Sequence, residues 1–111
     1  AKLVLDCRLS SLALDAQKQV HLLQIVREAV LNAIKHADAS EVSITLRQQE
    51  HRVFLHVADN GVGILAEKIP GFGIQGMRER VSALGGELTL ESNNGTRVIV
   101  NLPTNLQQIS R

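Results

Sequence analysis

The chain has 111 residues, of which 44% are hydrophobic, and this is enough for one domain with a core of its own. Twelve lysines and arginines stand against eleven aspartates and glutamates, so the composition excludes a protein whose whole surface attracts nucleic acid or anionic lipid. The single cysteine excludes an internal disulfide, and no apolar run approaches the ~20 residues that span a bilayer. We therefore expect one domain over residues 1–111, excised from a longer cytoplasmic part, with a polar tail at 104–111.

The first part of the chain predicts a strand and then a long helix. Residues 2–8 carry apolar side chains at every second position, as a short strand does. Asp15 is a suitable N-cap for a helix that continues to about residue 37. The helix has an apolar face that covers about half of the cylinder, broad enough to lie flat on a sheet. This face consists of Leu22, Ile25, Val26, Ala29, Val30, Ala33, Ile34 and Ala37.

The rest of the chain predicts two hairpins with a helix between them. In chain order these are strands at 42–46 and 53–57, a helix carrying Ile74, Met77, Val81 and Leu84, and strands at 88–91 and 96–102. Gly85-Gly86 ends the helix, and Asn93-Asn94-Gly95 is a strong turn signal. The expected fold is α+β, with two layers: helices on one face of a mixed, mostly antiparallel sheet.

The long helix carries a polar stripe beside its apolar face. Glu28, Asn32 and Lys35 lie within about 60° of one another at a helical turn of ~100° per residue. A carboxylate there could orient a hydroxyl, an amide oxygen could ligate Mg²⁺, and a lysine could meet phosphate. Taken alone, the stripe is more typical of a solvated helix edge.

A second candidate follows the strand at 53–57. Asp59 ends this strand, and Gly61 and Gly63 come directly after it. A carboxylate at this position can accept a hydrogen bond from a ligand amino group while the glycines let the ligand approach the backbone. A plain Asp-Asn-Gly turn would produce the same pattern.

The segment Gly71-Phe72-Gly73-Ile74-Gln75-Gly76 has the three-glycine spacing of dinucleotide-binding proteins. Its context excludes that fold, because Pro70 precedes it instead of a strand and the strands that follow form a hairpin. The glycines do precede a helix, whose free N–H groups and dipole can hold phosphate.

Together these segments resemble the nucleotide-binding domain shared by DNA gyrase, Hsp90, sensor histidine kinases and MutL. Glu28 to His36 is similar to the N box of that family, and Asp59 to Gly63 is similar to its first glycine box. Residues 71–77 resemble the second glycine box, and Gly95-Thr96 resembles the final one. The segment Gly76-Met77-Arg78-Glu79-Arg80 and a short lid of seven residues after Gly63 are similar to the nitrate/nitrite sensor kinases.

The resemblance implies a role for each matched residue. Asp59 accepts from the adenine amino group, Asn32 ligates Mg²⁺, and Lys35 meets phosphates together with the second glycine box. Glu28 is the catalytic residue that orients or activates the phosphoryl acceptor. The residues that it places at ATP are Asn32, Lys35, His36, Asp59, Gly61, Gly63, Gly71, Phe72, Gly73, Gly76, Met77 and Thr96. Phe72 is the only aromatic substitute for a separate phenylalanine box.

The expected function is transfer of the γ-phosphate of ATP to a histidine on a separate dimerisation domain. His21 is followed by Leu22-Leu23 instead of an acidic residue, and His51 and His56 fall on the predicted hairpin, so none of them is expected to be the acceptor. Cys7 is expected in the core. The resemblance further implies a response regulator as partner, no nucleic acid, a monomeric isolated domain in a homodimeric kinase, and a cytoplasmic place in an inner-membrane sensor. The alternative is an anti-sigma-like module that uses nucleotide to control a protein partner.

Overall fold

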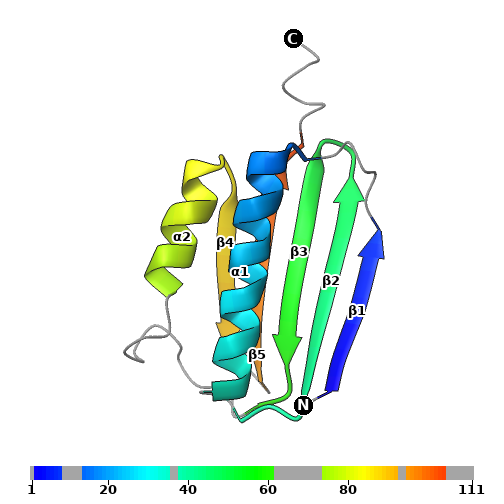
Figure 1. The fold of residues 1–111 in the computed structure, drawn as a ribbon, viewed down its shortest axis with the longest axis vertical. Helices are drawn as coiled ribbons and strands as arrows, with labels where there is room; N and C mark the ends of the chain where they lie inside the picture. Colours follow the sequence, from blue (N-terminus) through cyan, green and yellow to red (C-terminus); the bar gives the residue numbers. More distant parts are fainter. Residues whose placement is uncertain (1, 9–13, 36–37, 62–73, 93–94, 105–111) are drawn as a thin grey trace.

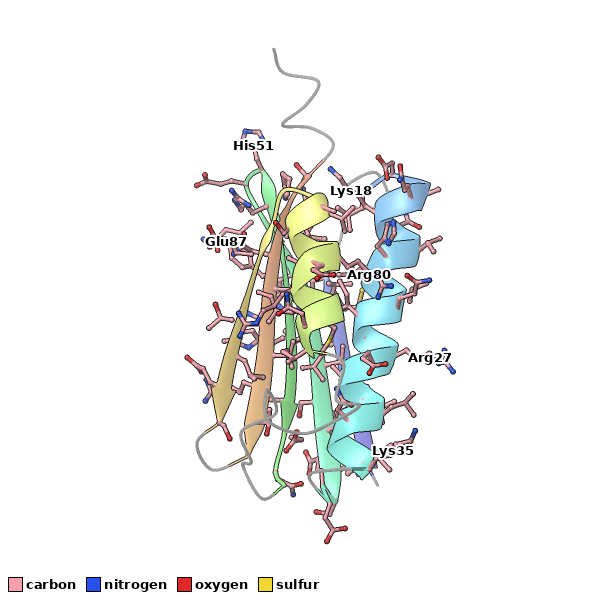
Figure 2. The ribbon with its side chains drawn as sticks, turned by 90° about the vertical axis from the view of Figure 1, so that its left-hand side faces the viewer. Lys18, Arg27, Lys35, His51, Arg80 and Glu87 are labelled. Atoms are coloured by element: carbon pink, nitrogen blue, oxygen red, sulfur yellow. The ribbon has the colours of Figure 1, made fainter. Side chains whose placement is uncertain are left out.

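The computed structural model describes residues 2–8, 14–35, 38–61, 74–92 and 95–104. Its elements are β1 (Lys2–Arg8), α1 (Ala16–Lys35), β2 (Glu41–Gln49), β3 (Arg52–Asp59), α2 (Ile74–Ala83), β4 (Glu87–Ser92) and β5 (Thr96–Pro103). The strands form one sheet in the order β1-β2-β3-β5-β4, in which β1 is parallel to β2 and the other neighbours are antiparallel. Both helices lie on the same face of this sheet (Figures 1 and 2). This arrangement confirms the predicted two-layer α+β fold.

Helix α1 begins as the sequence predicts. The carboxylate of Asp15 accepts a hydrogen bond from the backbone N–H of Lys18 at 2.8 Å, which is the bond of an N-cap. The residues that α1 buries against the sheet include Leu22, Ile25, Ala29 and Ala33. Ile34, expected on this face, is instead 50% exposed. Neither of the two described helices has the length and hydropathy to cross a membrane.

The core forms where the alternating strands meet the helices. Register places Ile44 opposite Val57, and Val57 opposite Val98, so that apolar side chains of neighbouring strands share the helix-covered face. The buried apolar residues of β2, β3 and β5 are Val42, Ile44, Val53, Leu55, Val57, Val98, Val100 and Leu102. The alternate residues face away from the helices, and this is why the three strands have a period of two in sequence.

Helix α2 ends at the predicted glycine pair. The N–H of Gly86 donates to the carbonyl of Val81 at 3.0 Å, and the N–H of Gly85 donates to the carbonyl of Ser82 at 3.0 Å. With Gly85 at a φ of 80°, these two bonds form a Schellman cap. A Cβ on Gly86 would lie 2.1 Å from the carbonyl oxygen of Asn101, so the cap also lets the chain approach β5 closely.

The position of Cys7 differs from the prediction. The sequence indicated a small core residue, but Cys7 is exposed, as are Leu3 and Leu5 on the same strand. The prediction was wrong because β1 is an edge strand of the sheet, whereas the helices lie over the strands beyond it (Figure 1). Alternation in sequence predicts a strand, but burial also requires a second layer above it.

We expect Gly86→Ala to lower the free energy of unfolding by about 3 kcal/mol, because the new methyl group would collide with the backbone of β5. Urea denaturation followed by circular dichroism measures this change. The matched control is Gly76→Ala in α2, where a Cβ would meet no atom within 4 Å. That variant should gain about 1 kcal/mol from the higher helix propensity of alanine. Equal unfolding midpoints for the two variants would contradict the packing described here.

Candidate nucleotide-binding site

Asp59 connects the end of β3 to the start of β5. Its carboxylate oxygen Oδ1 accepts from the backbone N–H of Gly61 at 2.8 Å and from the backbone N–H of Thr96 at 3.3 Å. The residue is half-buried, so these bonds are only partly in competition with water. One carboxylate therefore holds together both the turn after β3 and the first residue of β5.

The approach of β5 to Asp59 depends on Gly95. This residue has a φ of 109°, and a Cβ on it would lie 2.0 Å from the carbonyl oxygen of Asp59. A side chain is therefore excluded both by backbone conformation and by contact. The fold itself therefore requires glycine at position 95 in the final box, independently of any ligand.

Thr96, next to Gly95, has a buried hydroxyl. The residue is 4% exposed, and its Oγ1 has no hydrogen-bond partner in the described part of the chain. A buried polar group without a partner costs about 1–3 kcal/mol. The backbone N–H of the same residue is the one that the Asp59 carboxylate binds. A ligand that offered a polar group here would satisfy it.

Asn60 contributes to the site in a way that the sequence did not reveal. Its Oδ1 accepts from the backbone N–H groups of Ser40 at 3.0 Å and Glu41 at 2.9 Å, and its Nδ2 donates to the Ser40 hydroxyl at 2.8 Å. These bonds attach the turn after β3 to the beginning of β2. The only sequence signal was an Asn within a turn motif, which is common in any loop. Asn60 is a positioning residue for Asp59.

The polar stripe of α1 is not uniformly solvated. Asn32 is 3% exposed, Glu28 is half-buried, and Lys35, the last residue of α1, is exposed. Figure 2 shows Lys35 at the end of α1, and Figure 1 shows that β3 runs to the same end of the molecule. The burial of Asn32 argues against a solvated helix edge, because an amide is buried only where it serves a packing or binding purpose.

Of the second glycine box, the structure describes the part from Ile74 to Met77, at the start of α2. Gly76 is exposed, and the space around its Cα is open, so the backbone is accessible there. Met77 is 1% exposed and belongs to the core. Its side chain is therefore not available to a ligand, and only its backbone N–H, one of the first four of α2, could bind one. His36, Gly63, Gly71, Phe72 and Gly73 lie outside the described residues.

The remaining candidate groups do not form a second centre. Across the described residues, no three His, Cys, Asp or Glu side chains come together as metal ligands. His51 and His56 are exposed, at the β2–β3 turn and on β3. His21 is half-buried, and its Nδ1 has no hydrogen-bond partner in the structure as described.

Known proteins with similar sequences are sensor kinases. The chain is 52% identical over 107 residues to the nitrate/nitrite sensor protein NarQ of Escherichia coli. This match covers 92% of this chain and 19% of that protein. It is 45% identical to the histidine-protein kinase/phosphatase UhpB of Salmonella typhimurium, over 89% of this chain and 20% of that protein. The chain therefore spans only about a fifth of the length of these relatives.

Solved structures show the same fold at lower identity. The ATP-binding domain of PrrB from Mycobacterium tuberculosis matches 93% of this chain and 80% of that one, with a TM-score of 0.76 and 22% identity. The catalytic domain of histidine kinase ThkA matches 92% and 79%, with a TM-score of 0.74 and 22% identity. The profile described as "Histidine kinase-, DNA gyrase B-, and HSP90-like ATPase" matches residues 17–106. With most of the chain matched and the glycine-supported Asp59–Thr96 contact in place, this protein belongs to the histidine kinase, DNA gyrase B and HSP90-like ATPase family.

Proposed function

We propose that this chain is the ATP-binding catalytic domain of a two-component sensor histidine kinase, in which it transfers the γ-phosphate of ATP to a histidine on a separate dimerisation domain. The observation that carries the proposal is the hydroxyl of Thr96, which is buried with no partner among the described residues, on a residue whose backbone N–H binds the Asp59 carboxylate. Such a pair offers a hydrogen-bond acceptor and a hydroxyl to an aminopurine. The names of the relatives, which are sensor kinases, support the same class and do not favour an anti-sigma-like module.

Recognition of the base rests on the junction of β3 and β5. Asp59 is the acceptor for the adenine amino group. The hydroxyl of Thr96 would form its missing hydrogen bond with the base. Gly61 and Gly63 let the base approach the backbone. Because Asp59 already accepts from two backbone N–H groups, its carboxylate is held in place before the ligand binds, which reduces the entropy cost of binding.

The phosphates would bind between the end of α1 and the start of α2. Asn32 would supply an amide oxygen to Mg²⁺, and bound Mg²⁺ would neutralise charge on the phosphates. A single protein oxygen suits this ion, which keeps most of its water. Lys35, His36 and the backbone of the second glycine box (Gly71, Phe72, Gly73, Gly76 and Met77) would bind the phosphate oxygens.

Glu28 is the residue that we assign to the acceptor. It lies one helical turn before Asn32 and is half-buried, so its carboxylate could orient or deprotonate the attacking group beside the nucleotide. The proposed partners are the histidine-bearing dimerisation domain of the same protein and a response regulator. By analogy with the named relatives, we propose nitrate/nitrite-type sensing by an inner-membrane homodimer with this domain in the cytoplasm.

We expect Thr96→Val to weaken binding of a non-hydrolysable ATP analogue about tenfold, because the isosteric side chain removes the hydroxyl that the ligand would satisfy. The same change should leave the unfolding free energy unchanged or raise it, since the hydroxyl has no partner within the described residues. Titration calorimetry and urea denaturation measure the two quantities.

Asp59→Asn is the companion variant for this test. It keeps the oxygen that accepts from Gly61 and Thr96 but replaces the other carboxylate oxygen with an amide donor, so affinity should fall about tenfold to a hundredfold. Unchanged affinity in both variants would remove this junction from the nucleotide site. Loss of stability in Thr96→Val would show that its hydroxyl has a structural partner.

A separate prediction concerns the metal. Asn32→Ala should reduce the difference between the affinities measured with Mg²⁺ and with a chelator more than it reduces binding of the base, because the ion connects the amide oxygen to the phosphates. Calorimetry of ATP analogue and adenosine, each with and without Mg²⁺, separates the two effects. A variant that keeps the full Mg²⁺ dependence would show that Asn32 is not the ligand.

The last prediction here concerns phosphoryl transfer. With radiolabelled ATP, the isolated chain should bind nucleotide but incorporate no acid-labile label, because His21, His36, His51 and His56 include no acceptor. Addition of the dimerising helices of a close relative should restore label on a histidine of those helices. Glu28→Gln should slow this transfer at least tenfold with nearly unchanged nucleotide affinity. Label on a histidine of the isolated chain would contradict the proposal.

A further inference from the structure

Strand β1 leaves one edge of the sheet open. It pairs only with β2, and the strand order places it at the end of the sheet. Its central residues are apolar and exposed: Leu3 at 59%, Val4 at 39% and Leu5 at 67%. An exposed, apolar edge strand is a template for pairing with another strand, because its outer backbone groups have no partner in the sheet.

The outward backbone groups of β1 can be assigned. The N–H of Lys2 donates to the carbonyl of Ser40 at 2.8 Å, so the backbone groups of Lys2 point towards β2. Because successive residues of a strand alternate in direction, Val4 and Asp6 also point towards β2. The N–H and C=O groups of Leu3 and Leu5 therefore point to the open edge.

The opposite edge of the sheet is protected. Strand β4 carries the exposed carboxylates of Glu87 and Glu91 at that edge, and α2 packs against the same strand. Charged side chains and a covering helix are the usual means by which proteins prevent edge pairing. Strand β1 also carries charged residues, but three successive apolar ones, Leu3, Val4 and Leu5, lie between Lys2 and Asp6.

The sequence of β1 is complementary to itself. We propose that β1 pairs in antiparallel fashion with β1 of a second copy of this chain, in a register centred on Val4. This register sets Val4 opposite Val4, Leu3 opposite Leu5, and Lys2 opposite Asp6, with each pair on one face of the sheet. The outward backbone groups of Leu3 and Leu5 then form the hydrogen-bonded pairs, and Val4 forms the non-hydrogen-bonded pair.

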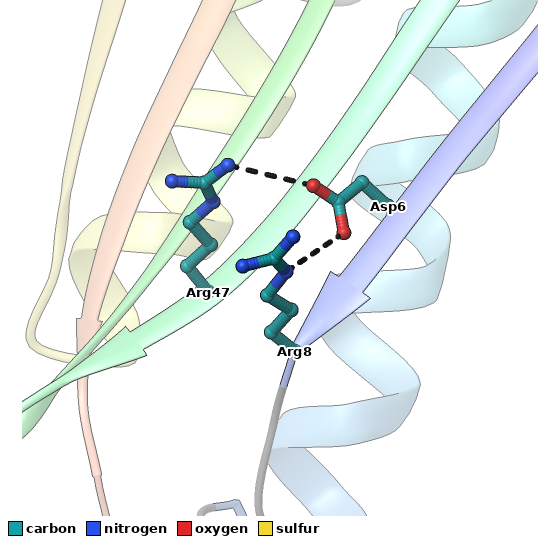
Figure 3. Close-up of polar contacts among 3 residues, drawn as sticks. All are labelled: Asp6, Arg8 and Arg47. Atoms are coloured by element: carbon teal, nitrogen blue, oxygen red, sulfur yellow. Dashed lines mark hydrogen bonds and ion pairs between the residues drawn. The ribbon is translucent and has the colours of Figure 1, made fainter.

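Charge selects this register over its neighbour. The register centred on Leu5 would place Lys2 opposite Arg8, and like charges directly opposite each other are unfavourable. In the proposed register Lys2 meets Asp6, whose carboxylate already binds Arg8 at 3.3 Å and Arg47 at 3.4 Å (Figure 3). These two arginines hold the carboxylate on the face that is away from the helices, where Lys2 of the second copy would arrive.

The proposed contact is isologous, so it uses both β1 edges and closes at a dimer. The resemblance to the kinase family implied a monomeric isolated domain, and the open edge is the structural reason to infer a dimer instead. The proposal does not depend on nucleotide binding, because β1 is at the far edge of the sheet from β5 and its Thr96.

Cysteine cross-linking tests the register. In a Cys7→Ser background, Val4→Cys should form a disulfide-linked dimer under mild oxidation, since residues in a non-hydrogen-bonded pair have Cα atoms about 4.5 Å apart. Leu5→Cys is the matched control, because in this register two Leu5 residues are diagonal neighbours, too far apart for a disulfide. Cross-linking of Leu5→Cys in preference to Val4→Cys, or of neither variant, would overturn the proposal.

Charge reversal tests the pairing without cysteines. Sedimentation equilibrium of the wild-type chain should show a monomer–dimer equilibrium, and Lys2→Asp should weaken the dimer roughly tenfold, because two attractive pairs become repulsive. The double variant Lys2→Asp/Asp6→Lys should recover the wild-type affinity, since it restores opposite charges in the same register. A monomeric wild-type chain at all concentrations, or a double variant no tighter than Lys2→Asp, would overturn the proposal.

Discussion

The close approach of Gly95 to the backbone of Asp59 is the constraint on which the candidate site depends. Because no Cβ intervenes, the first residue of β5 comes within hydrogen-bond distance of the Asp59 carboxylate, and Thr96 becomes buried beside it. Asn60 then fixes the same turn to the start of β2. The sheet thus forms the junction at the candidate site from backbone contacts, and Asp59 and Thr96 are positioned by the fold itself.

This junction has a cost for stability. The hydroxyl of Thr96 is buried with no partner among the described residues, which is unfavourable compared with an apolar residue of similar size. Gly76 is similar, since alanine would be a better helix former and would meet no neighbouring atom. Functional sites are where such departures from the most stable choice are expected.

The two helices cover the sheet unequally, and this has a second consequence. Helix α2 packs against β4 at one edge, whereas β1 at the other edge presents Leu3 and Leu5 to solvent on the helix side. Three of the exposed large apolar residues are therefore consecutive on β1, and the others are on α1 and β3. The strand order also separates the candidate nucleotide site, at β3 and β5, from the surface that we propose for association.

The sequence by itself determined the order of elements, the Asp15 cap, the Gly85-Gly86 stop and the four boxes of the family. Each of these depends only on neighbouring residues or on a fixed spacing along the chain. The helix-covered faces of β2, β3 and β5 were predictable for the same reason. Only the tertiary structure decided that β1 is an edge and Cys7 is exposed, that Ile34 is exposed, and that the Thr96 hydroxyl is buried with no partner among the described residues. Those properties depend on which segments, distant in sequence, lie above or beside a residue, and no local pattern encodes that.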